Sequence, residues 1–137
     1  MGITAEEFAR HYPRVYHMAE AGTWQSIERL GLMSTSALLD RFGVNGKRRF
    51  DLEACHRPES EPIQHEKFGI AVIRDQKPMS DRGLLKCLLD GLTPSQWYKN
   101  LNGKVFFWVS EERLNRLLAA RVGQESRHGC GVVTWVL

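Results

Sequence analysis

A short apolar segment that ends in a histidine, Val15-Tyr16-His17, constrains the fold more than any other stretch of this chain. Its alternation places Val15 and His17 on one face of a strand and Tyr16 on the other. A helix with an apolar face is expected next, over residues 23–30, and Gly31 is expected to end it. Because polar groups where a chain leaves a sheet often line small-molecule sites, the segment predicts a site at His17.

The remaining pattern predicts a mixed α+β fold. Runs of β-branched and aromatic residues predict three further strands, at residues 68–73, 104–109 and 132–137. Capping residues and apolar spacing predict short helices that begin near Thr4, Ser34 or Ser36, Ser80, Pro94 and Ser110. We therefore expect a small twisted mixed sheet flanked by short helices, built from the strands around Val15, Ile70, Phe106 and Val133.

A length of 137 residues predicts a single domain over residues 1–137. The apolar spacing fails between residues 44 and 67, which contain Pro58 and Pro62, so an irregular loop is expected there. The chain ends inside an apolar run, whereas domains usually finish on the surface. This ending predicts a fragment, or a reading frame altered after about Gly123.

Composition indicates the cellular compartment and limits the classes of binding partner. The net charge of +3 is compatible with a polyanionic partner but lacks the dense Lys/Arg footprint of a dedicated nucleic-acid binder. Three cysteines, an odd number, predict free thiols in a reducing compartment. Neither a signal peptide nor a membrane-spanning run is apparent, so a cytoplasmic protein without a membrane partner is expected.

His17 is the first candidate for chemistry. A histidine at a strand end can hydrogen-bond a ribose hydroxyl or exchange a proton near neutral pH. The alternative is a half-buried histidine that is satisfied by a backbone carbonyl. The aromatic run Phe106-Phe107-Trp108 is similarly open, since it can stack on a base or nicotinamide ring or pack into the core on both faces.

Polar residues elsewhere have competing interpretations. Arg74 and Gln76 follow a predicted strand, where Arg74 could pair with a phosphate or belong to a solvated turn. The basic run Lys47-Arg48-Arg49 could track a phosphate backbone, although a solvated loop is the simpler interpretation.

Cysteine and histidine spacing predicts no metal site. Adjacent Cys55-His56 and the pair His128 and Cys130 do not match the paired ligands of structural zinc sites. No glycine loop of a known phosphate-binding type occurs.

The strand ending in Tyr16-His17, Ile27 in the following helix and Gly31-Leu32 resemble the opening of the ADP-ribosyltransferase fold. The aromatic stretch 105–110 resembles the strand that stacks on nicotinamide in that family. The likeness extends distantly to RNA 2'-phosphotransferases and to DNA-targeting ADP-ribosyltransferase toxins. The whole chain also resembles members of an uncharacterised bacterial domain family, which implies no activity.

The resemblance implies NAD as cofactor and a nucleotide as small-molecule partner. The cleft it implies is lined by Tyr16, His17, Ser34, Arg74, Gln76 and Phe107. Such proteins act as glycosyltransferases: nicotinamide leaves and an acceptor attacks the ribosyl cation. The family usually presents a late glutamate, for which Glu125 is the positional candidate, so the implied catalytic residues are His17 and Glu125. The alternative is a non-catalytic domain that binds nucleic acid or protein.

Overall fold

The computed structural model describes residues 2–77, 79–122 and 130–136, with the backbone alone for residues 120–122 and 130–136. Seven helices and four strands lie within these residues, so the expected mixed α+β class is confirmed. The chain divides into two compact units. Unit 1 comprises Met1–Trp24 and Phe106–Leu137, and unit 2 comprises Gln25–Val105. The prediction that they form a single domain stays a prediction.

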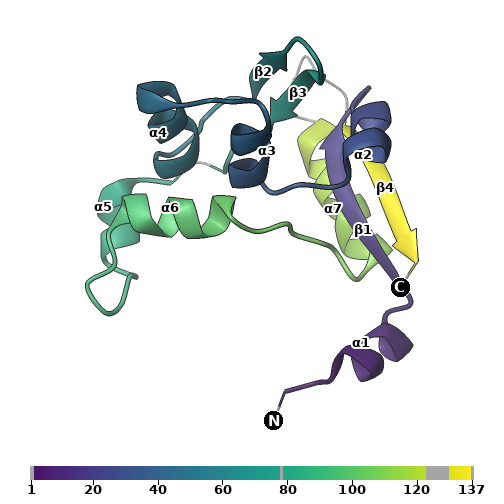
Figure 1. Ribbon diagram of the computed structural model, residues 1–137. Coiled ribbons are helices and arrows are strands. Elements are labelled where there is room, and N and C mark those ends of the chain that lie inside the picture. Colours follow the sequence, from purple (N-terminus) through teal and green to yellow (C-terminus); the bar gives the residue numbers. More distant parts are fainter. Residues whose placement is uncertain (1, 78, 123–129, 137) are drawn as a thin grey trace. The chain divides into compact units, whose positions relative to one another are not determined.

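Unit 1 is built on one antiparallel strand pair. Strand β1 (Arg14–Glu20) pairs with β4 (Cys130–Val136), as Figure 1 shows. In this pairing His17 lies opposite Val133. Helix α1 (Ala5–His11) precedes β1, and α7 (Glu111–Val122) precedes β4. The predicted capping box of α1 is confirmed, because Thr4 and Glu7 each bond the other's backbone N–H.

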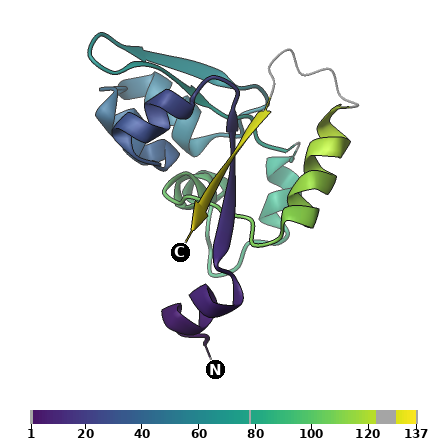
Figure 2. The ribbon, with the colours of Figure 1, turned by 90° about the vertical axis from the view of Figure 1, so that its right-hand side faces the viewer.

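Unit 2 packs a β-hairpin against short helices. The hairpin is β2 (Glu61–His65) with β3 (Gly69–Ile73), and Figures 1 and 2 show it beside α3 (Thr35–Arg41) and α4 (Gly46–Ala54). The other helices are α2 (Trp24–Leu30), α5 (Asp81–Leu85) and α6 (Pro94–Asn102). The core of this unit draws on α3, α4 and both strands, through Leu39, Phe42, Leu52, Ile63, Ala71 and Ile73.

Local signals correctly predicted the starts of α3 and α5 and the glycines that follow α2 and α3. The hydroxyls of Ser34 and Ser80 accept hydrogen bonds from backbone N–H groups in the first turns of α3 and α5. Gly31 and Gly43 follow α2 and α3 with φ of +83° and +65°, a conformation that residues with a Cβ rarely adopt. These caps confirm that short-range chemistry sets where the helices begin and end.

The expected single sheet is wrong. The strands around Val15 and Val133 pair with each other, whereas the strand around Ile70 pairs with β2 in a separate hairpin. The segment around Phe106 makes one isolated bridge, between Trp108 and Tyr16. A β-rich composition favours an extended chain, but a strand also needs a partner along its length, which this segment lacks within the described residues.

The expected irregular loop over residues 44–67 is also wrong. It contains all of α4 and β2. Ion pairs between Lys47 and Asp51 and between Arg49 and Glu53 have the i,i+4 spacing of a helix. These pairs support α4 where the apolar periodicity is weak.

Candidate functional site

Two segments of unit 1 lie side by side at the histidine. The backbone N–H of Tyr16 donates to the carbonyl of Trp108, and the N–H of Trp108 donates back to the carbonyl of Tyr16, both at 2.8 Å. This reciprocal pair holds the aromatic segment against β1. It brings the backbone of Phe106 next to the side chain of His17.

The hydrogen bond of His17 defines its tautomer. Its Nδ1 lies 2.9 Å from the carbonyl oxygen of Phe106. Because a carbonyl oxygen only accepts, Nδ1 carries the hydrogen, and Nε2 is the acceptor nitrogen of the neutral ring. The Phe107 ring meets the imidazole edge-on, with 6.0 Å between centroids. This carbonyl bond is the contact expected of a structural histidine, and it also defines which ring nitrogen is the acceptor.

The aromatic segment lies at the surface, which contradicts the interpretation that it packs into the core on both faces. Phe106, Phe107 and Trp108 are 56%, 45% and 36% exposed. Exposed aromatic rings can stack on a planar ligand. The arrangement therefore keeps the stacking interpretation of the segment open.

A carboxylate that the sequence analysis did not select also belongs to this group. The Tyr16 hydroxyl lies 3.4 Å from Oε2 of Glu111, the first residue of α7. A glutamate directly after the aromatic segment was the available sequence signal. We call Tyr16, His17, Phe107 and Glu111 the His17 cluster.

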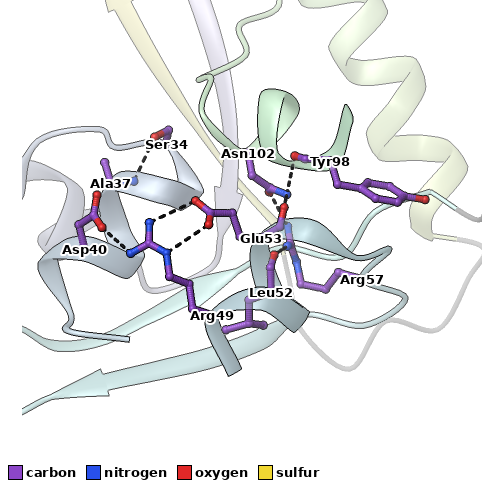
Figure 3. Close-up of polar contacts among 9 residues, drawn as sticks. All are labelled: Ser34, Ala37, Asp40, Arg49, Leu52, Glu53, Arg57, Tyr98 and Asn102. Carbon is purple, nitrogen blue, oxygen red and sulfur yellow. Dashed lines mark hydrogen bonds and ion pairs between the residues drawn. The ribbon is translucent and has the colours of Figure 1, made fainter. Parts of the chain in front are cut away.

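The other residues of the predicted cleft belong to unit 2. Ser34 caps α3 by accepting from the N–H of Ala37 at 3.2 Å (Figure 3). The Arg74 carbonyl and the Gln76 side chain both accept hydrogen bonds from Arg57. A cleft that joins these residues to His17 stays a prediction, and Glu125 lies outside the described residues.

Arg57 is a buried side chain of unit 2 with several hydrogen bonds, and sequence reasoning missed it. It is 6% exposed and donates to the carbonyls of Arg74 and Leu52 and, at 3.4 Å, to Oδ1 of Asn102. Asn102 in turn donates to the carbonyls of Glu53 and Tyr98 at 2.9 and 3.0 Å (Figure 3). This network joins the end of α4 to the end of α6.

Burial sets the electrostatics of the network. Removal from water lowers the pKa of Arg57 to about 10, against the opposing charges of Asp75 and Glu61. The side chain therefore stays charged at neutral pH while its donors bond carbonyl and amide oxygens. These contacts indicate a structural role in holding the two helix ends.

The basic run is engaged within unit 2, on a helix rather than in the expected loop. Lys47 pairs with Asp51 at 2.5 Å, and Arg48 donates to the Pro62 carbonyl at 3.0 Å. Arg49 lies between Asp40 and Glu53 (Figure 3). These contacts reduce the charge available for tracking a phosphate backbone.

Two features are absent from the described part of the chain. In residues 2–77, 79–122 and 130–136, no group of three or more His, Cys, Asp or Glu side chains could hold a metal ion. Within the same residues, no helix combines the length and apolar character needed to cross a membrane.

Comparisons with known proteins identify a family without an assigned activity. No curated protein and no solved structure matches the chain. A family of unknown function, DUF7002, matches residues 13–133, which include β1, all of unit 2 and the aromatic segment. The chain therefore belongs to the DUF7002 family of unknown function.

Proposed function

We propose that unit 1 binds NAD at the His17 cluster, as ADP-ribosyltransferase-like proteins do. The hydrogen bond from His17 Nδ1 to the Phe106 carbonyl is the observation that supports this most directly. It assigns Nε2 as the acceptor beside the exposed Phe107 ring. One hydrogen-bond acceptor next to one aromatic ring suits a ribose hydroxyl next to a nicotinamide ring.

Each member of the cluster has a role in the proposal. His17 Nε2 accepts a hydrogen bond from a ribose hydroxyl, and the Phe107 ring stacks on nicotinamide. The Glu111 carboxylate, within reach of the Tyr16 hydroxyl, supplies negative charge near the ribose. Such charge would stabilise an oxocarbenium-like transition state.

A transfer reaction would follow from this binding mode. The bond between ribose C1′ and the nicotinamide nitrogen breaks, and nicotinamide leaves with the electron pair. A nucleophilic atom of the acceptor then bonds to C1′, and its proton passes to a base or to water. The resemblance implies Glu125 as the catalytic glutamate. The contact between Glu111 and Tyr16 makes Glu111 a second candidate for the same role.

Isothermal calorimetry with NAD tests the proposal. We expect saturable binding by the wild-type chain and its loss in His17→Ala. His11→Ala is the matched control, because His11 also bonds a backbone carbonyl through Nδ1, at 2.8 Å from Glu7. The proposal is contradicted if the folded wild-type chain does not bind NAD, or if His17→Ala binds as tightly as His11→Ala.

A non-catalytic binding domain is the second candidate, and the exposure of Phe106, Phe107 and Trp108 favours it. Such a domain could use these rings for nucleic acid or protein. Oligonucleotide binding that weakens steeply with salt and in a Lys47/Arg48/Arg49 alanine triple variant would support the nucleic-acid form. Insensitivity to both changes would count against it.

A further inference from the structure

Three cations of unit 2 converge on one phenylalanine. Arg29 of α2 donates from Nη2 to the Phe68 carbonyl at 2.8 Å. Arg41, at the end of α3, places its guanidinium carbon 4.8 Å from the centre of the Phe68 ring, and Lys67 places Nζ 5.8 Å from it. All three cations are exposed. We call Arg29, Arg41 and Lys67 the Phe68 cation cluster.

Within the described part of the chain, the cluster has no carboxylate partner. Among the described residues, none of its three cations forms an ion pair. Asp40 precedes Arg41 in the sequence but bonds Arg49 instead. Three like charges from two helices and a turn meet around one ring, so they raise the local positive potential. This differs from the basic run, where Lys47 and Arg49 are paired.

The cluster is built on packed residues. The His65 ring stacks on Phe68 with 4.6 Å between centroids, and Phe42 lies at 5.9 Å. The backbone N–H of Lys67 donates to His65 Nδ1 at 3.1 Å, which fixes the turn between β2 and β3. Because Phe68 is already covered by His65 and Phe42, it serves as a support, and the cluster offers charge rather than a stacking surface.

We infer that the Phe68 cation cluster binds the phosphates of a nucleic-acid strand. Exposed ion pairs with isolated carboxylates contribute little binding free energy, so an acidic peptide gains little from this site. A strand of closely spaced phosphates releases condensed counterions at each cation, and arginine forks match phosphate oxygens. The site lies wholly in unit 2 and does not depend on the NAD proposal.

Fluorescence anisotropy with a labelled single-stranded oligonucleotide tests the inference. Three phosphate contacts predict a slope of log affinity against log salt of about −2, at about −0.7 per contact. The double variant Arg41→Gln/Lys67→Gln should reduce the slope to about −0.7. Lys86→Gln/Arg116→Gln is the matched control: it removes the same charge from an exposed lysine and an exposed arginine that lie outside the cluster.

Two further variants and two competing ligands separate the possible outcomes. The variant Arg41→Lys/Lys67→Arg keeps the charge and should keep the wild-type slope. Lys67→Gln alone should make the slope less steep by about 0.7, which tests the inference even if the double variant does not fold. An equal loss in the control variant would overturn the inference, because net charge alone would then explain binding. Binding to phosphatidylserine vesicles but not to the oligonucleotide would also overturn it, as would equal competition by polyglutamate.

Discussion

Nδ1 of His17 lies 2.9 Å from the carbonyl oxygen of Phe106, a residue 89 positions away in the sequence. The contact depends on the reciprocal backbone bonds between Tyr16 and Trp108, which hold the two segments together. A backbone pairing between segments distant in the sequence thus determines which nitrogen of the neutral His17 ring carries the hydrogen. The proposed hydrogen bond from NAD to His17 depends on this tautomer.

This contact predicts the tautomer of the neutral His17 ring. We expect the hydrogen on Nδ1, because the Phe106 carbonyl can only accept. Long-range proton–nitrogen NMR correlation at a pH where the ring is neutral measures the tautomer. A ring that carries its hydrogen mainly on Nε2 would contradict the described geometry.

Leu39 lies in the core of unit 2, so we expect its truncation to lower the stability of the protein strongly. This side chain is 0% exposed, so Leu39→Ala should lower the free energy of unfolding by about 2–5 kcal/mol, through lost apolar contacts and the cavity left behind. Leu89→Ala is the control, since Leu89 is 77% exposed and its loss should change stability by no more than about 0.5 kcal/mol. Urea denaturation measures both, and equal effects would argue against the assigned core.

Tyr98 predicts a loss of stability at high pH. Burial, followed by the hydrogen bond and charge of Asp81, raises the pKa of Tyr98 above its ordinary value of 10.0. Above about pH 10 the unfolded chain releases this proton while the folded chain keeps it, so stability falls as pH rises. Tyr98→Phe removes this contribution, and its unfolding free energy should fall less steeply above about pH 10. Parallel curves for the two proteins would refute the prediction.

The surroundings of Cys55 and Cys87 predict which thiol is alkylated faster. Burial, with smaller effects of the Asp51 and Asp81 charges, raises the pKa of the half-buried Cys55 thiol. Because the thiolate is the nucleophile, Cys55 should react with iodoacetamide more slowly than the exposed Cys87. Peptide-resolved mass spectrometry measures both rates. Faster alkylation of Cys55 would show that its surroundings are misassigned.

Local signals predicted the elements better than their pairing. Thr4 with Glu7, Ser34, Ser80 and Gly31 act within a few residues, and the structure confirms their caps or stops. The single sheet was wrong because strand pairing depends on residues distant in the sequence, and a β-rich run such as 104–109 does not identify its partner. The i,i+4 charge pairs of α4 were visible in the sequence and could have indicated the helix.

The candidate sites were predictable in part. The sequence analysis selected Tyr16, His17 and Phe107, which the structure brings together in unit 1. It did not select Glu111 for this group: its place directly after the aromatic segment was a signal, but its link to Tyr16 spans 95 positions. The Phe68 cation cluster was missed for the same reason, since its cations come from separate elements and meet only in the fold.

The most direct test of the account is a proton–nitrogen NMR titration of the isotopically labelled chain with NAD. The account predicts saturable shift changes in the His17 ring and in the amides of Phe106, Phe107 and Glu111, the residues at or beside the proposed site. The ring of His65 and the amide of Phe68, in the separate cation cluster, should stay unchanged. Shift changes confined to residues other than the His17 cluster, or no change at saturating NAD, would contradict the proposed nucleotide site.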